Sequence, residues 1–523
     1  MDLRAMPVHD RTRRGPRASS RLLLVGALVI AMLGVTAEAD AAVIASVRNN
    51  TLTVKGAGAA EKITIRRGAP GRLVVDVGDN GSADYTFLRS TFTRIVVNAG
   101  AGADRLKINE SNGVFTNTEA TTLNGQAGND VLLGGSSHEV LRGGTENDTV
   151  DGNRGGDDVG MGPGNDSFVW NAGDGADTVS GDADEDTVTV NGSAAPDTIT
   201  VSPTAVVGHA LVSGGPDVAT VEALNVNGLG GEDTLSAGAV TGLFQLTFDG
   251  GAGDDILNGG NGNDILIGGS DGDRVDGNQG ADVALLGTGD DVFVWDPGDG
   301  SDVVEGGAER DELLFNGSAA TEIFGASANG SRLLFARNIG NIVMDTDDVE
   351  ILTVHALGGV DTVTVNDLSA TDVQNVDVDL GVAGVGDVAL DTVIVNATNN
   401  ANAVRISGAS GGVSVISPYL AVGIVDAEPA SDSLIVNASF GADVVSATTL
   451  ASTSVILTLN GSTGDDILVG SQGNDTINGG SGDDYIDGDP GNDTLDGGAD
   501  TDTIDGGTGT DSAINGENVV NVP

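Results

Sequence analysis

The sequence predicts an all-β protein in which arrays of short stacked strands, a β-solenoid, alternate with longer β-rich repeat units. Two observations predict this fold class. Sixteen nine-residue units recur in three blocks, each with an acid at the sixth place, and a longer unit of alternating Val, Ile, Leu and Thr recurs four times. Alternation of this kind between Gly-rich and Asn-Gly breaks is typical of short strands and turns rather than helices.

The composition supports a thin, repeated core. The chain has 523 residues, of which 82 are glycine, with no cysteine, 3% aromatic residues and a formal net charge of −54. So few rings argue against one large core, and the absence of cysteine means that disulfides do not stabilise the protein. The polyanionic composition argues against nucleic acid as a partner, and we expect no basic stripe.

The first segment resembles a secretory signal peptide in its order of features. Six arginines precede the apolar run Leu22 to Val35, and small residues follow at Ala39 and Ala41. We expect cleavage after Ala41, and the run is short for a membrane span. An uncleaved anchor is the alternative. The sequence therefore predicts a secreted, extracellular protein without a membrane span after cleavage.

The order of the segments follows from the two repeats. The four β-rich units share an opening pattern such as "TVTVNGSAAPDTITV" at 187 and a second pattern such as "LNVNGLGGED" at 224. We predict a signal peptide at 1–41, β-rich units at 42–124, 186–249, 311–386 and 387–460, nine-residue arrays at 125–185, 250–310 and 461–514, and a tail at 515–523. The first two arrays end alike at Trp170 and Trp295, which indicates duplication.

Backbone geometry explains the residue types of the nine-residue unit GGxGxDxUx, where U is apolar. Glycines permit positive φ in a sharp turn, and the last three residues form a minimal strand that points U inward. Stacking buries a column of U residues, such as Leu257, Leu266 and Val275 in the middle array. It also lines up the sixth-place aspartates at the strand spacing of about 4.8 Å.

Such a row of carboxylates needs a counter-ion. Two unit charges about 5 Å apart repel by about 3 kcal/mol at an effective dielectric of 20. Carboxylate oxygens and glycine carbonyl oxygens outside a regular ladder form the all-oxygen donor set that Ca²⁺ prefers. With no Cys and four His, the chain has little with which to bind zinc or copper. Multiple calcium ions are therefore the cofactor we infer.

The three blocks resemble the repeats-in-toxin (RTX), or hemolysin-type, calcium-binding nonapeptide family. The resemblance covers residues 125–169, 250–294 and 461–514. It implies a parallel β-roll with two nonapeptides per turn and calcium held between stacked turns. The ligands that it implies are Asp130, Asp148, Asp157, Asp166, Asp255, Asp264, Asp273, Asp282, Asp291, Asp466, Asp475, Asp484, Asp493, Asp502 and Asp511.

Departures from the pattern concentrate in the first array. There Glu139 replaces the sixth-place aspartate, while Ser137 and Glu146 replace fourth-place glycines. We expect this array to bind fewer or weaker ions. In the middle and last arrays, Ala284 and Ala513 thin the apolar column.

Signals for an enzyme are weak. The G-x-S-x-G pattern occurs around Ser270 and Ser410, but a chain this rich in glycine is expected to match it by chance. His138, His209 and His355 are scattered, and His355 stands where the other units have asparagine, which favours a role in a turn. We therefore predict no catalytic residues and no enzyme.

The sequence favours a secreted calcium-binding protein with a structural or adhesive extracellular role. A secreted hydrolase that uses the repeats as a scaffold is the alternative from another class. An adhesin that binds glycans or cells is a third possibility, and the sequence does not identify its cell-surface or matrix partner. The tail "NGENVVNVP" has no sorting motif, so we expect release.

Overall fold

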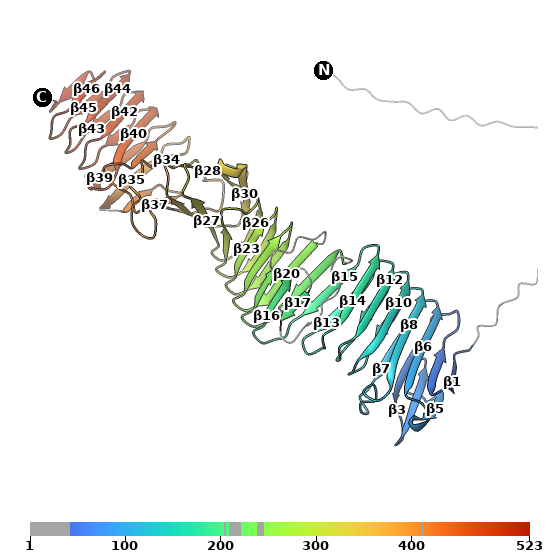
Figure 1. Cartoon of the computed structure of the whole chain (residues 1–523). Coiled ribbons are helices and arrows are strands. Elements are labelled where there is room, and N and C mark those ends of the chain that lie inside the picture. The colour runs from blue at the N-terminus through green and yellow to red at the C-terminus, as the bar shows by residue number, and fades with distance from the viewer. Residues whose placement is uncertain (1–41, 203–204, 209–220, 238–244, 410–411, 523) are drawn as a thin grey trace, which may run out of the picture. The chain divides into compact units, whose positions relative to one another are not determined.

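The computed structural model describes residues 42–202, 205–208, 221–237, 245–409 and 412–522. Within them it contains no α-helix, only strands and the short 3-10 turns η1 (Arg89–Thr91) and η3 (Ile339–Asn341). The described residues belong to one unit that begins at Ala42 (Figure 1). The predicted signal peptide at 1–41 lies outside the described residues, as do His209 and Ser410.

The strands form three ladders, named here in pairing order. Sheet A contains β1 (Ile44–Arg48), β2 (Thr51–Lys55), β6 (Arg94–Ala101), β8 (Ala120–Ala127), β10 (Glu139–Thr145), β12 (Asp158–Pro163) and β14 (Thr178–Ala183). Sheet B contains β5 (Tyr85–Leu88), β4 (Arg72–Val77), β3 (Lys62–Arg67), β7 (Arg105–Asn109), β9 (Val131–Leu133), β11 (Thr149–Asp151), β13 (Ser167–Asn171), β15 (Thr187–Asn191), β18 (Ala223–Asn227), β20 (Gln245–Ala252), β22 (Ile265–Ser270), β24 (Val283–Thr288), β26 (Val303–Ala308), β30 (Ile342–Asp347), β29 (Arg332–Arg337), β28 (Ile323–Asn329), β32 (Thr362–Val365), β34 (Thr392–Asn396), β38 (Ser433–Asn437), β40 (Ile456–Thr463), β42 (Thr476–Ser481), β44 (Thr494–Ala499) and β46 (Ser512–Ile514). Sheet C contains β17 (Ala205–Gly208), β16 (Thr198–Ser202), β19 (Thr234–Ala237), β21 (Ile256–Asn261), β23 (Arg274–Gln279), β25 (Val292–Trp295), β27 (Glu312–Ser318), β31 (Ile351–Leu357), β33 (Asn375–Asp379), β37 (Ala421–Val425), β36 (Gly412–Ile416), β35 (Ala403–Ala409), β39 (Val444–Leu450), β41 (Ile467–Val469), β43 (Tyr485–Asp487), β45 (Thr503–Asp505) and β47 (Asn518–Val520).

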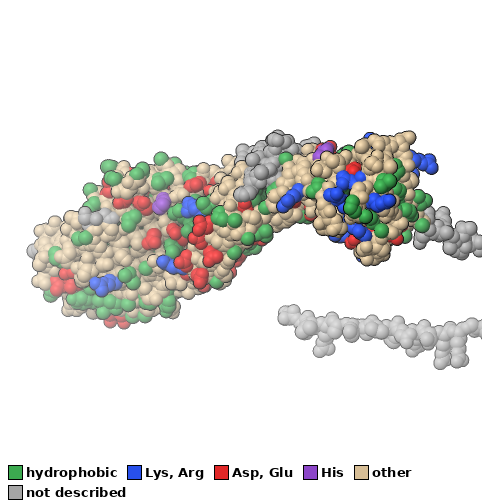
Figure 2. Space-filling model, turned by 90° about the horizontal axis from the view of Figure 1, so that it is seen from below, with side chains coloured by type: hydrophobic (Ala, Val, Ile, Leu, Met, Phe, Trp, Pro, Cys, Tyr) green, Lys and Arg blue, Asp and Glu red, His purple; other side chains and the backbone are tan. Residues whose placement is uncertain are grey.

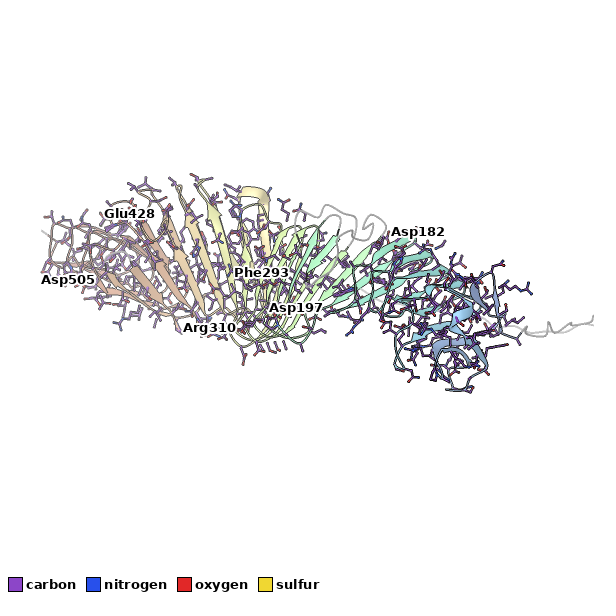
Figure 3. The ribbon with its side chains drawn as sticks, turned by 60° about the horizontal axis from the view of Figure 1, so that its bottom comes forward. Asp182, Asp197, Phe293, Arg310, Glu428 and Asp505 are labelled. Carbon is purple, nitrogen blue, oxygen red and sulfur yellow. The ribbon has the colours of Figure 1, made fainter. Side chains whose placement is uncertain are left out.

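Successive nonapeptides alternate between two sheets, so that two of them complete one coil of the solenoid. In the middle array Leu257 pairs with Val275 in sheet C, whereas Leu266 pairs with Ala284 in sheet B. All four side chains are buried, as is Phe293 (Figure 3). The single apolar column that stacking suggested is therefore wrong: there are two columns, and each advances by 18 residues. The two-per-turn β-roll is confirmed.

Strands of the middle array are longer than the expected three residues. β22 continues into the first glycines of the next repeat, and Gly269 pairs with Gly287 in register. The expectation that these glycines lie outside a regular ladder is wrong here, because parallel coils place glycine against glycine and leave the backbones free to pair.

The β-rich units continue the same ladders. In the third unit β28, β29 and β30 form an antiparallel meander whose outer strands pair in parallel with β32 and β26. In the fourth unit β35, β36 and β37 do the same between β39 and β33. Strands β8, β20 and β40 each span a border between a unit and its array. The arrays and units are thus stretches of one solenoid.

Aromatic side chains gather where the middle array meets the third unit. Trp295 stacks on Phe315 with ring centroids 4.0 Å apart, and Phe335 meets Phe315 edge-on at 4.9 Å. Arg337 lies over the Trp295 ring and pairs with Glu322, which is fully buried. The equivalence of the two tryptophans extends to their contacts, because each indole N–H donates to the carbonyl oxygen of the glycine five residues on.

Positive charge collects on the first β-rich unit. Lys62 pairs with Arg105 in the neighbouring strand β7, and Lys107 follows Arg105 by two residues in that strand. Figure 2 shows Lys and Arg side chains gathered at that end of the molecule. The expectation of no basic stripe is therefore wrong for this unit, since the sheet brings together cations that lie far apart in the sequence.

Candidate metal sites

Most nonapeptide turns use left-handed backbone at their second and fourth places, although Gly135 and Ser137 in the first array and Ser471 and Gly473 in the last do not. Gly251 and Gly253 have φ of 104° and 121°. Where the fourth place is not glycine, as at Glu146 and Asp271, φ is still 78°. At these two positions the turn shape is thus kept without glycine, at a cost of order 1 kcal/mol per residue.

The sixth-place aspartates are buried and linked from coil to coil. The backbone N–H of Asp255 donates to Oδ1 of Asp273 at 2.9 Å, and that of Asp273 donates to Oδ1 of Asp291 at 2.7 Å. Asp264 and Asp282 are joined in the same way at 2.8 Å. Odd and even repeats therefore build two separate aspartate ladders in each array.

The other carboxylate oxygen has no donor. Oδ2 is buried without a hydrogen-bond partner in every predicted ligand aspartate except Asp475. In Asp475 this oxygen accepts the N–H of Ser471 at 2.6 Å. A buried acceptor left unpaired costs about 1–3 kcal/mol, so these oxygens require a cation or a proton.

The first-place glycine makes room for this oxygen. A Cβ on Gly250 would collide with Oδ2 of Asp255 and with the carbonyl oxygen of Gly268 in the next coil. Two acceptor oxygens, one anionic and one neutral, thus lie close together without a hydrogen between them. Oxygen donors of this kind suit Ca²⁺, which takes six to eight such ligands, so the residues fit the inferred ion.

Burial also raises the pKa of these carboxyl groups. The pKa of Asp273 rises to about 7, that of Asp282 to about 8 and that of Asp157 to about 9. Desolvation is the largest cause, the N–H from the neighbouring coil opposes it, and adjacent carboxylates add to it. A proton or a metal ion can therefore each relieve the same buried charge.

In the first array Glu139 takes the place of an aspartate. It is fully buried, and its Oε2 accepts the N–H of Gly135 at 2.7 Å while Oε1 has no partner. Desolvation raises its pKa to about 7. The longer side chain is thus accommodated, with one oxygen used inside its own turn.

The aspartate ladders extend beyond the residues that the sequence singled out. The additional buried acids whose carboxylates accept a backbone N–H from the preceding coil are Asp104, Asp177, Asp186, Asp233, Asp302, Asp311, Asp361, Asp391, Asp432 and Asp443. A signal was present, because most of them stand two places before a buried apolar residue, as in "GADRL" and "GEDTL". The changed spacing between coils hid them.

A second polar column accompanies the carboxylates. Asn478 donates to Asn460, Asn460 to Asn437, and Asn437 to Asn396 at 2.6–2.7 Å. His355 occupies the corresponding place in the third unit, where Nδ1 lies 2.8 Å from Oδ1 of Asn316. His355 is in strand β31, so its expected role in a turn is wrong.

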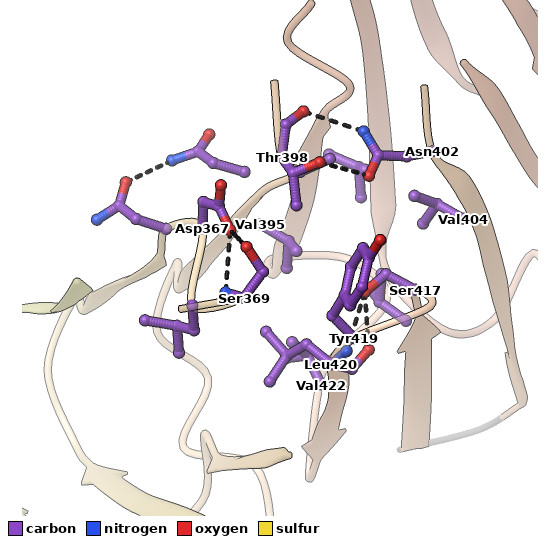
Figure 4. A pocket seen from close by; sticks show the side chains of 16 residues that line it. Asp367, Ser369, Val395, Thr398, Asn402, Val404, Ser417, Tyr419, Leu420 and Val422 are labelled. Carbon is purple, nitrogen blue, oxygen red and sulfur yellow. Dashed lines mark hydrogen bonds between the residues drawn. The ribbon is translucent and has the colours of Figure 1, made fainter. Parts of the chain in front are cut away.

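The catalytic candidates are dispersed. Ser270 ends strand β22, and His138 is mostly exposed and lies in a turn. The pocket of Figure 4, lined by Asp367 and Ser369 of the third unit and by Val395, Tyr419 and their neighbours in the fourth, has a volume of about 30 Å³. That is room for about one water molecule.

Comparisons with known proteins identify the repeats. A model of the RTX calcium-binding nonapeptide repeat, in its four-copy form, matches residues 115–141, 133–168, 171–199, 249–284, 267–294, 460–495 and 479–513. No curated protein matches the chain. In the part of the chain that the structure describes, no helix is long and apolar enough to cross a membrane.

Proposed function

We propose that this chain, which carries RTX calcium-binding nonapeptide repeats in a β-roll, is a secreted protein that orders its arrays by taking up several calcium ions. The proposal further assigns it a structural or adhesive role outside the cell. The observation that carries it is the set of buried Oδ2 atoms without a donor in three separate arrays.

The chain's own residues explain why the ion and the fold depend on each other. Without a counter-charge, closing Asp255 onto Asp273 buries two carboxylates and leaves an acceptor of each unpaired. A bound divalent ion supplies positive charge between such turns. The aspartates of the three arrays are the proposed ligands. The first array is proposed to bind fewer or weaker ions because one carboxylate oxygen of Glu139 already accepts the N–H of Gly135.

Circular dichroism of the full chain with and without calcium tests the ordering. We expect a smaller strand signal in chelator than with millimolar calcium, and a midpoint of roughly 10⁻⁴ to 10⁻³ M, as in other extracellular calcium modules. Magnesium at the same concentration is the control, because its octahedral preference suits these sites poorly. A spectrum that calcium leaves unchanged would refute the proposal.

Secretion is tested separately. Expressed in a bacterial host, the full chain should appear in the medium or at the cell surface without residues 1–41, whereas a chain that lacks residues 2–41 should stay inside the cell. Retention of both forms would contradict the export proposal and leave calcium binding unaffected. A hydrolase activity that disappears with Ser410→Ala would favour the scaffold alternative instead.

A further inference from the structure

Four turns outside the family matches have the same backbone as the nonapeptides. We call them the landmark turns: residues 99–107, 228–236, 356–364 and 438–446. In each, the second and fourth places have positive φ, the sixth residue is a buried aspartate and the eighth is a buried apolar residue. The four aspartates are Asp104, Asp233, Asp361 and Asp443. Each landmark turn is thus a degenerate nonapeptide embedded in a β-rich unit.

Three landmark turns stack directly on the first repeat of an array. The N–H of Asp233 donates to Oδ1 of Asp255 at 2.7 Å, and the N–H of Gly231 donates to the carbonyl oxygen of Ala252 at 2.8 Å. Inside the array, the N–H of Asp255 donates to Oδ1 of Asp273 at 2.9 Å, and the N–H of Gly253 donates to the carbonyl oxygen of Ser270 at 3.1 Å. The joint between unit and array therefore has the bonds of an array step, although the spacing is 22 residues instead of 18.

The other two joints repeat this pattern. The backbone N–H of Asp104 donates to Oδ1 of Asp130 at 2.8 Å, and the N–H of Gly102 donates to the carbonyl oxygen of Ala127 at 2.8 Å. Asp443 donates to Asp466 at 2.8 Å, and the N–H of Gly441 donates to the carbonyl oxygen of Thr463 at 3.0 Å. The three joints thus share their inter-coil contacts with the interior of the arrays.

The oxygen atoms available to bind a metal ion are also the same at the joints as inside the arrays. Asp104, Asp233 and Asp443 are 1–2% exposed, and Oδ2 of each is buried without a partner. A Cβ on Gly228 would collide with Oδ2 of Asp233 and with the carbonyl oxygen of Gly250, as at Gly250 itself. Ala99 and Ala438 replace this glycine in the other two turns, so the Asp233 joint keeps the pattern most fully.

The fourth landmark turn provides an internal contrast. Asp361 is equally buried and its Oδ2 is also unpaired, but no nonapeptide follows. The N–H of Gly359 donates to the carboxylate of Asp387 at 3.1 Å instead of to a carbonyl oxygen. The N–H of Asp361 does donate to Oδ1 of Asp391 in the next coil at 2.8 Å, so the contrast lies in the missing bond between the Gly359 N–H and a carbonyl oxygen of that coil.

We infer that Asp104, Asp233 and Asp443 each contribute to an additional calcium site at the joint between a landmark turn and the first repeat of an array. This inference rests on the proposed function, because it assumes that the arrays bind calcium. It extends the ion-binding part of the chain into residues that the family matches leave out. The β-rich units are then held to the arrays by ions as well as by strand pairing.

Counting bound calcium per chain by native mass spectrometry tests the inference. Asp233→Asn keeps an Oδ1 acceptor for the N–H of Asp197 and removes the charge. We expect the full chain with Asp233→Asn to hold one ion fewer than wild type at the lowest calcium concentration that saturates the wild type. Asp361→Asn removes an equally buried charge, and we expect it to keep the wild-type count.

Several outcomes separate the two proposals. A wild-type count for Asp233→Asn, or an equal loss for Asp361→Asn, would overturn the inference while the arrays still bind calcium. A wild-type chain that holds no calcium would instead refute the proposed function. Far-UV circular dichroism at saturating calcium checks that the variants fold, and Asp104→Asn and Asp443→Asn test the other joints, each with an expected loss of one ion.

Discussion

Replacing Asp273 by asparagine should have opposite effects on stability with and without calcium. The new Nδ2 takes the place of the unpaired Oδ2, which lies beside the carbonyl oxygen of Leu286. The amide can donate there, and Oδ1 still accepts the N–H of Asp255. In chelator, removing an unpaired buried acceptor should stabilise the protein by about 1–3 kcal/mol.

With calcium the sign reverses, because the variant loses an anionic ligand. For a dissociation constant of roughly 10⁻⁴ to 10⁻³ M and roughly 10 mM calcium, each site stabilises the folded state by about 1–3 kcal/mol. The two effects are thus of similar size and opposite direction. For a cooperative unit of 150–250 residues, each kcal/mol moves the thermal midpoint by about 2–4 °C.

The assay is thermal unfolding followed by circular dichroism, in chelator and in calcium. Asp271→Asn is the matched control: it removes a charge two residues away at an exposed place whose φ of 78° asparagine tolerates. We expect the control to change neither midpoint by more than about 2 °C, since exposed substitutions are usually within about 0.5 kcal/mol. If Asp273→Asn lowered both midpoints equally, the carboxylate would act as a packing element and the reasoning would fail.

Further predictions concern acid, backbone space and the core. The folded-state pKa of Asp273 is about 7 and that of Asp282 about 8, against about 3.9 in the unfolded chain. The protonated groups therefore stabilise the metal-free fold fully below about pH 4, and this stability is lost as pH rises through 7 to 8. Circular dichroism in chelator should show more strand at pH 5 than at pH 9, and the reverse order would contradict the pKa shifts. Gly268→Ala places a methyl group against the Leu286 carbonyl oxygen and should cost about 1–3 kcal/mol in urea unfolding, whereas an unchanged midpoint would show that the turn can open. Phe315→Ala should cost about 3–5 kcal/mol and shift Trp295 emission to longer wavelengths, since the rings stack at 4.0 Å; unchanged emission would argue against that contact. Glu322→Gln leaves the buried Arg337 without its anion and should cost about 3–5 kcal/mol, measured in the same way, and a loss below about 1 kcal/mol would mean that the pair behaves like an exposed one.

Local chemistry made part of this fold predictable. The repeated acid at the sixth place and the apolar residue at the eighth place identify the turn, the short strand and the ligand type, because each depends on nearest neighbours in the chain. The nonapeptide pattern indicated the β-roll, and the sixth-place aspartates are buried in its turns. The domain borders and the ligand roles stay predictions.

Tertiary structure decided what nearest neighbours cannot. Val275 pairs with Leu257 in sheet C and not with Leu266, because two repeats complete a coil and strand pairing joins residues 18 apart. Asp233 joins the aspartate ladder through a strand pairing that spans 22 residues, a spacing that no local period reveals. Lys62 and Arg105 form a basic patch for the same reason. The sequence by itself determined the repeating turn and its chemistry, while only stacking between distant coils decided which carboxylates meet, since the distance between charges, and not their order in the chain, sets their energy.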